Sequence, residues 1–273
     1  MSAFVGARTR AAGFPRWPLV AAVTAGRRTL ANPSGLAATA FFYLVATGVV
    51  GSLWRAAAET TATGTLVGYD ARAFTWYIAI SEVAMMALPF RMVENVGDDI
   101  AGGEVASDML RPASVVGVRI AAAVGAAIPR MGACLAVGVA ASLLIVGRPP
   151  DLAAFAFLPL ALLLAVVTNV ACQHAVAAAA FWVRDAQSAW FVYQKFVLIL
   201  GGVLMPLQVM PDWLEAVAVR LPFAAMAYVP ARLASGHVEP ELLALQAGWM
   251  VVVTGLAVLT FARGERRLQA VGG

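Results

Sequence analysis

Ionisable and polar side chains are rare within the apolar stretches of this chain, so the few that occur there are candidates for chemistry. Glu82 stands about midway along one such stretch. A carboxylate in that position could bind a cation or carry a proton, or it could be protonated or hydrogen-bonded in a contact between helices. Arg130 could pair with Glu82, or its side chain could extend to the polar interface.

Asn169 and Gln173 form a second candidate. They are four residues apart, and this spacing places two side chains on one face of a helix. Their amides could line a path for a polar solute, or they could hydrogen-bond to a neighbouring helix. Together with Glu82, they are the residues that we predict for a pathway through the protein.

Several kinds of catalytic and metal site are not predicted. A Walker A loop needs a Gly-Lys-Ser/Thr sequence, whereas the only lysine, Lys195, lies between Gln194 and Phe196. The two histidines and the two cysteines follow no metal-binding spacing. We therefore expect no metal, no cofactor and no enzyme activity in this chain, and we expect a separate subunit to hydrolyse any nucleotide that is required.

The elements that must position these residues follow from the composition. The chain is 62% hydrophobic and 12% charged, with a mean hydropathy of +0.82, whereas soluble domains are about 25% charged. These values predict an all-α, polytopic membrane protein. The formal net charge of +4 is then informative about which loops face the cytoplasm, and it does not indicate binding to nucleic acid.

Six apolar stretches are long enough to span a bilayer, which takes about 20 residues. We take 34–262 as the transmembrane domain. Pro129 is expected to divide the third stretch, and Pro159 is expected to kink the fourth. The six stretches are 34–54, 71–90, a part of 115–147, a part of 152–181, about 188–208, and 241–262.

Residues 1–33 and 263–273 flank this domain. The segment 14–33 is too short and too charged to span, so we predict an interfacial helix that ends at the turn Asn32-Pro33. Thirteen basic residues fall on one side of the predicted spans and five on the other. This bias places both termini in the cytoplasm, and the expected location is a bacterial plasma membrane.

The last predicted outside connection, 205–240, is long and contains five prolines. It is too apolar for a solvated loop, and the pieces between its prolines are too short to span a bilayer. We therefore predict two short helices that cap or re-enter the outer leaflet.

The stretch 96–114, VGDDIAGGEVASDMLRPAS, is unusually polar and belongs to a predicted cytoplasmic insert, 91–114. Val93, Val96 and Ile100 repeat at helical spacing, and the acidic residues lie largely off that stripe. One or two short amphipathic helices across the membrane surface are predicted. The insert could be a solvated loop, or it could dock on a partner, since an anionic leaflet would favour Lys and Arg instead.

Two segments resemble those of a known family. GGEVASDMLRPAS is similar to the cytoplasmic signature of ABC type-2 permeases, which has a Gly-Glu turn, a short helix and a Leu-Arg-Pro after the second span. The segment from Phe181 to Gly236 is similar to the family's late region in its Phe-Trp, Gly-x-x-x-Pro-Leu, Pro-x-Trp-Leu and Leu-Pro-Phe motifs. The order and spacing of these motifs carry the resemblance, which covers about residues 16 to 265.

The resemblance implies the permease half of an ATP-driven ABC exporter. Two permease chains, identical or related, would pair in the membrane, and two copies of a separate ABC ATPase would bind ATP and Mg below them. The segment 14–33 would be an elbow helix. The insert would dock on the ATPase through Gly103, Glu104, Leu110, Arg111 and Pro112. The short helices in 205–240 would form an extracellular gate with Pro206, Pro211, Trp213 and Pro222.

Two other functions stay open. The chain could be a membrane scaffold subunit that has a stable partner but no pathway. It could also be a proton-coupled transporter that uses Glu82. The lipid bilayer is a partner in every case.

Overall fold

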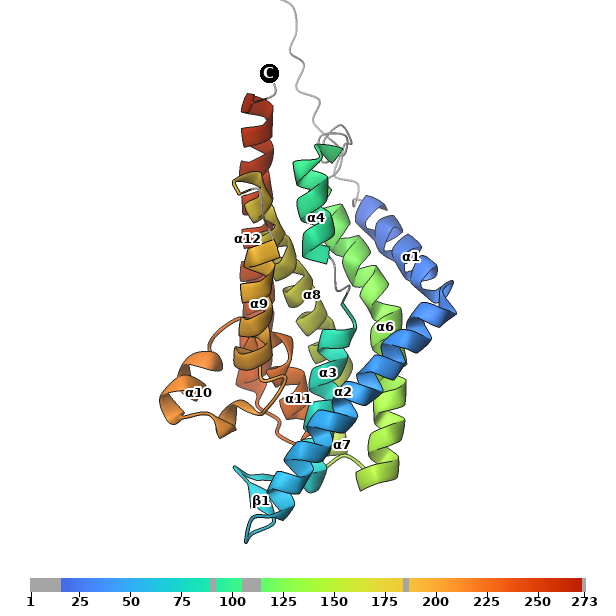
Figure 1. The fold of residues 1–273 in the computed structure, drawn as a ribbon, viewed down its shortest axis with the longest axis vertical. Helices are drawn as coiled ribbons and strands as arrows, with labels where there is room; N and C mark the ends of the chain where they lie inside the picture. Colours follow the sequence, from blue (N-terminus) through green and yellow to red (C-terminus); the bar gives the residue numbers. More distant parts are fainter. Residues whose placement is uncertain (1–15, 89–91, 105–113, 184–186, 272–273) are drawn as a thin grey trace, which may run out of the picture.

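The computed structural model describes residues 16–88, 92–104, 114–183 and 187–271. Within these ranges the protein is a bundle of helices with one small antiparallel hairpin, in which Thr65 pairs with Asp70 (Figure 1). The expected all-α architecture is confirmed. The helices are α1 Arg16–Leu30, α2 Pro33–Glu59, α3 Ala71–Met86, α4 Met92–Ala101, α6 Val115–Val146, α7 Leu152–Ala156, α8 Leu158–Ala177, α9 Gln187–Leu200, α10 Asp212–Ala218, α11 Tyr228–Ala234 and α12 Pro240–Val271; the strands are β1 Thr65–Leu66 and β2 Tyr69–Asp70, and the 3-10 helices are η1 Ala178–Phe181, η2 Leu207–Val209 and η3 Ala224–Met226.

Four helical segments of the described chain are long and apolar enough to cross a membrane. They are Pro33–Glu59, Val115–Val146, Leu158–Phe181 and Pro240–Arg267. Helices α3 and α9 fall at the second and fifth predicted spans, but they contain only 16 and 14 residues. At 1.5 Å per residue these helices are about 24 and 21 Å long, compared with a hydrocarbon core of about 30 Å. Six spans therefore stay a prediction.

The fifth stretch was expected to extend to about residue 208, but α9 ends at Leu200. Two glycines, Gly201 and Gly202, explain why α9 ends there. Gly202 has a positive φ of 71°, and a Cβ added there would lie 2.7 Å from the Tyr77 hydroxyl. A Cβ added at Gly201 would lie 2.2 Å from the Val197 carbonyl oxygen. The chain can leave the helix and pass close to α3 here because glycine has no side chain.

The expected division of the third stretch at Pro129 is wrong, because α6 is one helix of 32 residues that contains this proline. Proline has no N–H, so the carbonyl of Gly125 loses its usual helical donor. That carbonyl oxygen faces α1, where a Cβ added at Gly26 would lie 3.0 Å from it. A Cβ added at Gly125 would in turn lie 2.1 Å from the Ala22 carbonyl oxygen. Helices α1 and α6 therefore pack backbone against backbone.

Helix α1 and helix α2 are joined by a short turn that the chain encodes locally. Asn32 accepts a 3.0 Å hydrogen bond from the Gly35 N–H with its side-chain oxygen and so caps α2. Pro33 occupies the first position of α2, where no N–H is needed. Pro159 plays the same part in α8: the chain bends at Phe157, between α7 and α8, and Pro159 stands in the first turn of α8.

Helix α4 packs its apolar face against the bundle, whereas its expected placement at the membrane surface stays a prediction. It lies beside α8 and α9 and runs roughly along them (Figure 1). Val93, Val96 and Ile100 are buried in a core cluster that also holds Val170 and Phe261. The spacing of these three residues therefore predicts the apolar face of α4, and that face covers α8 and its neighbours in the bundle.

The two ends of the bundle differ (Figure 1). We call the end at which α4 and α12 terminate the α4 end. The opposite end, the β1 end, carries the β1–β2 hairpin together with the segment 201–239, in which η2, α10, η3 and α11 follow one another. The predicted pieces between the prolines of this segment are thus helical, although the piece from Phe223 to Tyr228 is largely a 3-10 turn.

Candidate functional site

Asn169 and Gln173, which were predicted together, are joined by a hydrogen bond in α8. The Gln173 amide donates to Asn169 Oδ1 over 3.1 Å, and the Tyr193 hydroxyl of α9 donates to the same oxygen over 2.7 Å. Asn169 Nδ2 lies 4.0 Å from the Met85 sulfur of α3. We call Asn169, Gln173 and Tyr193 the amide cluster.

The amide cluster lines a cavity of about 50 Å³ between α3, α8 and α9. Gln173 Oε1 is buried and has no hydrogen-bond partner among the described residues. A buried acceptor without a donor is unfavourable by about 1–3 kcal/mol. A water molecule or the N–H or O–H group of a solute in this cavity would satisfy it. Whether the cluster lines a transport pathway stays a prediction.

Tyr193 was not among the predicted site residues. Its signal in the sequence is weak, because one tyrosine in an apolar helix resembles many others. Its ring stacks on Trp190 at 5.6 Å between centroids, and its hydroxyl also lies 3.5 Å from the Met226 sulfur. Only the packing of α9 on α8 brings this hydroxyl to Asn169.

Glu82 lies in α3 and is buried, but it takes no part in the amide cluster. No described residue forms a hydrogen bond or ion pair with its carboxylate. The pairing with Arg130 that the sequence left open is not formed. The neighbouring residues Ile80 and Val83 belong to an apolar cluster that also contains Cys134. Glu82 is thus a buried acid without a partner among the described residues, and its part in a pathway stays a prediction.

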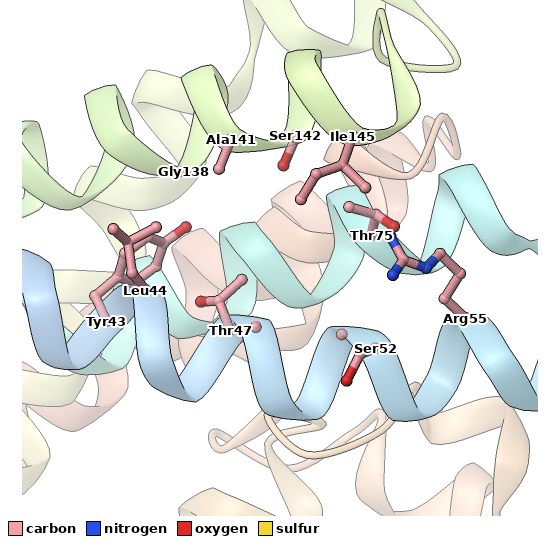
Figure 2. Close-up of a pocket in the computed structure, with 12 residues that line it drawn as sticks. Tyr43, Leu44, Thr47, Ser52, Arg55, Thr75, Gly138, Ala141, Ser142 and Ile145 are labelled. Carbon is pink, nitrogen blue, oxygen red and sulfur yellow. The ribbon is translucent and has the colours of Figure 1, made fainter.

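A larger cavity, of about 140 Å³, lies between α2, α3 and α6 (Figure 2). We call it the α2–α3–α6 cavity. No predicted site residue lines it. Its signal in the sequence is weak, because its polar groups are common hydroxyls and its cation, Arg55, lies near a predicted loop. It is lined by Tyr43, Leu44, Thr47, Gly48, Gly51, Ser52, Arg55, Thr75, Gly138, Ala141, Ser142 and Ile145.

A charged network holds the β1 end together. Arg232 of α11 donates to Glu239 over 2.7 Å and to the Tyr69 hydroxyl over 2.8 Å. Tyr69 in turn contacts Gln208 over 3.4 Å, and Gln208 donates to the Tyr228 hydroxyl. We call these residues the end network. It links the hairpin to the segment 201–239.

The protonation of the end network follows from its burial. Burial raises the pKa of Tyr69 above its ordinary value, against the opposing effect of the Arg232 guanidinium. Tyr69 is therefore a neutral hydroxyl that accepts from Arg232 and donates to Gln208. Burial lowers the pKa of His237, whose ring lies 5.2 Å from that of Tyr69, and Arg232 lowers it further.

The four residues predicted for the extracellular gate occupy different environments at the β1 end. Pro206 is buried before η2, and Pro222 is half-buried. Pro211 precedes α10 and is exposed, and Trp213 is 70% exposed on the same helix. The structure therefore places Pro211 and Trp213 together on the outside of the bundle and Pro206 in its interior.

The predicted docking residues fall partly within the described chain. Gly103 closes α4 with a φ of 78°, a conformation that favours glycine, and its N–H donates to the Ile100 carbonyl over 3.3 Å. Glu104 follows this turn and is exposed at the α4 end. Leu110, Arg111 and Pro112 lie outside the described residues.

Comparison with known proteins agrees with this architecture. Residues 38–272 match the family described as ABC-2 family transporter protein. No curated protein matches the chain. The matched range includes most of α2 and every described helix that follows it. Because this match covers most of the chain, and because the helices are apolar and long enough to cross a membrane, this multi-pass membrane protein belongs to the ABC-2 family of transporter proteins.

Proposed function

We propose that this protein is the permease subunit of an ATP-driven exporter, in which it forms a solute pathway with a second permease chain and docks a separate ABC ATPase. The observation that carries the proposal is the end of α4. Its apolar stripe fixes the helix to the bundle, while the turn at Gly103 brings Glu104 to the surface of the α4 end. A partner that binds this turn would contact the end of a helix, α4, that is fixed to the rest of the bundle.

Helix α4 is attached to the bundle by specific contacts. Helix α4 contacts α8, η1 and α9, and Asp99 of α4 forms a 2.6 Å ion pair with Arg119 of α6. Helices α8 and α9 carry the amide cluster. A push on α4 would therefore move the two helices that join at Asn169 and Tyr193. This is a physical route from nucleotide hydrolysis to alternating access, because packed helices move as discrete units.

The proposed orientation places the α4 end in the cytoplasm and the β1 end outside. The excess of basic residues on the predicted inner loops supports this orientation. The membrane would be a bacterial plasma membrane. The end network would then brace the outer ends of α3 and α11, next to the residues proposed for the gate.

A second permease chain, identical or related, is part of the proposal. Several large apolar side chains of α2 and α9 are exposed, and each must face lipid or another chain in a membrane. They are Phe41, Phe42, Val45, Val49 and Leu53 on α2, and Phe191, Val192, Phe196 and Ile199 on α9.

A proton-coupled transporter is the second candidate, and the isolated Glu82 favours it. A buried acid that has no partner among the described residues could bind and release a proton during transport. This candidate needs no ATPase, so the two functions differ in the partner that they require.

Co-purification tests the proposal. The tagged protein is isolated from its native membranes in mild detergent, and the proteins that accompany it are identified by mass spectrometry. Glu104→Arg is compared with Glu241→Arg, which changes an exposed acid at the opposite end of the bundle. We expect a Walker-motif ATPase with the wild type and with Glu241→Arg, and its loss with Glu104→Arg.

Two results would contradict the proposal. If no ATPase accompanies the folded wild type, no subunit supplies ATP hydrolysis to this chain, and the proton-coupled or scaffold function takes precedence. If an ATPase binds equally to all three proteins, the turn after α4 is not its docking site.

A further inference from the structure

The α2–α3–α6 cavity is a second place at which this protein can hold a molecule. It is separate from the amide cluster and shares no lining residue with it. Its volume of about 140 Å³ is well above the roughly 10–15 Å³ that one water molecule needs. The residues that line it determine which molecule it can hold.

The space exists because of small residues on facing helices. A Cβ added at Gly48 would meet nothing within 4 Å, and one added at Gly51 would touch only Ile78, at 4.0 Å. Glycines usually allow membrane helices to approach each other closely. Tyr43 reaches across from α2 to α6 at one end of the cavity, where its hydroxyl occupies the position that a Cβ at Gly138 would take.

Two hydroxyls in the middle of the cavity lack partners. Thr47 Oγ1 is buried and has no hydrogen bond. Ser142 is only 2% exposed and forms no hydrogen bond with the described residues, and its hydroxyl points from α6 into the gap (Figure 2). Buried polar groups are nearly always hydrogen-bonded in folded proteins, so Thr47 Oγ1 is suited to a bound molecule with a donor or acceptor atom, and the Ser142 hydroxyl faces the same space.

One cation stands at the end of the cavity. Arg55 lies in the last turns of α2, near Thr75 (Figure 2). No described residue forms an ion pair or hydrogen bond with Arg55. The nearby acids do not neutralise it: Asp70 accepts from the Ala73 N–H as a helix cap, and Glu59 is exposed one turn beyond Arg55.

The lining changes in polarity along one direction. Arg55 is at one end, Thr47 and Ser142 are in the middle, and Leu44 and Tyr43 are at the other end (Figure 2). Arg55 lies eleven positions after Leu44 in α2, which is a rise of about 16 Å along the helix. A phospholipid has the same order of groups, with a phosphate, then ester oxygens, then an acyl chain.

The cavity also opens toward the surface that would face the bilayer. Leu44 is 40% exposed and Ile145 is 58% exposed, and both line it. A lipid could therefore enter sideways with its chain in the hydrocarbon. The zwitterionic and anionic lipids of a membrane differ in net charge, and a guanidinium without a protein carboxylate favours the anionic ones.

We propose that the α2–α3–α6 cavity binds an anionic phospholipid, with its phosphate against Arg55, its ester oxygens near Thr47 and Ser142, and part of an acyl chain along Leu44. The bound lipid fills the gap between α2 and α6 and satisfies the two hydroxyls. The site depends only on the protein spanning a membrane, so it does not rest on the proposed ATPase.

Native mass spectrometry of the purified, delipidated protein tests the site. The probes are phosphatidylglycerol and phosphatidylcholine with identical acyl chains, and free glycerol phosphate is added in excess in a third arm. We expect the wild type to retain phosphatidylglycerol preferentially. Arg55→Gln should weaken that binding about tenfold, which is the effect of losing one charge-assisted hydrogen-bonded contact, and should leave phosphatidylcholine binding unchanged.

Two filling variants test the groove itself. Gly48→Leu and Ile145→Trp should each reduce the binding of both lipids, because the new side chains occupy the cavity. Gly132→Leu and Arg72→Gln are the matched controls. Gly132 also has open space around its Cβ position, and Arg72 is an exposed arginine at the same end of the bundle, but neither lines the cavity. Both controls should bind as the wild type does.

The proposal is overturned by any of three results. Equal retention of the two lipids by the wild type would mean that there is no anion site. Unchanged lipid binding in folded Gly48→Leu and Ile145→Trp would mean that the lipid is elsewhere on the surface. Displacement of phosphatidylglycerol by glycerol phosphate would mean that the site takes a free anion. Loss of the ATPase in the co-purification experiment would leave all of these measurements unaffected.

Discussion

The hydroxyl of Tyr193 donates a 2.7 Å hydrogen bond to Asn169 Oδ1 and thereby joins α9 to α8 at a buried point. The same oxygen also accepts from Gln173. The bond lies beside the cavity of the amide cluster. In the proposed mechanism, any movement of α9 relative to α8 would have to strain or break this hydrogen bond.

Tyr193→Phe should therefore remove the hydrogen bond between α9 and α8 while keeping the packing of the aromatic ring. Hydrogen bonds between membrane helices contribute about 0.6–2 kcal/mol, and we expect a decrease in unfolding free energy of that size. A double-mutant cycle with Asn169→Ala, followed by denaturant titration in detergent micelles, isolates the pair. A coupling energy of zero would show that the two side chains do not stabilise each other.

The close contact of α1 with α6 gives a second prediction. Gly125→Ala places a methyl group 2.1 Å from the Ala22 carbonyl oxygen, so the helices must separate. Overpacking of this kind usually costs about 1–3 kcal/mol. Gly132→Ala, on the same helix in open space, should be nearly neutral. Thermal unfolding in detergent compares them, and equal midpoints for the two variants would refute the contact.

The turn after α4 gives a third prediction. Gly103 has a φ of 78°, and a β-branched residue is strained there, whereas asparagine tolerates it. Gly103→Val should lose the ATPase in the co-purification experiment, and Gly103→Asn should retain most of it. If both variants bind equally well, the geometry of the turn is not part of docking.

Glu82 separates the two candidate functions. Glu82→Gln keeps the shape of the side chain but removes its ability to ionise. In vesicles that contain the purified transporter, we expect ATP-dependent transport to continue at an altered rate with this variant. Transport that needs a proton gradient in the wild type, and that stops completely in Glu82→Gln, would instead identify a proton-coupled carrier.

The end network should respond to pH through His237. Burial and then Arg232 lower the pKa of this histidine below its ordinary value of about 6.5. The folded protein thus prefers the neutral ring. Its contribution to stability is complete above about pH 6.5 and declines as the pH falls through that value toward the lowered folded pKa.

Limited proteolysis of the segment 201–239 between pH 7.5 and 5 would detect this change. We expect faster cleavage at the lower pH in the wild type, and a smaller difference in His237→Gln, which keeps a polar side chain but cannot titrate. An identical pH dependence in the two proteins would assign the effect to another group.

The helical pattern was largely predictable because local chemistry decides it. Asn32-Pro33 begins α2, Gly201-Gly202 follows the last residue of α9, and the spacing of Val93, Val96 and Ile100 predicts the buried face of α4. Each of these features depends on residues within a few positions of one another. The glycines after α9 could have corrected the length of the fifth stretch, but a continuous apolar run hid them.

The site was predictable only in part. Asn169 and Gln173 are one helical turn apart, so their contact follows from the sequence. Tyr193 joins them from another helix, and Arg55, Thr47 and Ser142 meet at one cavity only because α2 packs beside α6. The spacing of these residues in the chain contains no periodicity that would reveal the meeting.

The sequence by itself therefore determined that this protein is apolar, helical and built for a membrane, because composition and short-range spacing control hydrophobic burial and helix ends. Tertiary structure alone decided which polar groups are paired and which are left for a ligand. Arg232 donates to Tyr69 across 163 positions of the chain, whereas Thr47, Ser142 and Arg55 face a cavity and gain no such partner. Hydrogen bonds and ion pairs act over a few ångströms, so they depend on the packing of distant helices rather than on order along the chain.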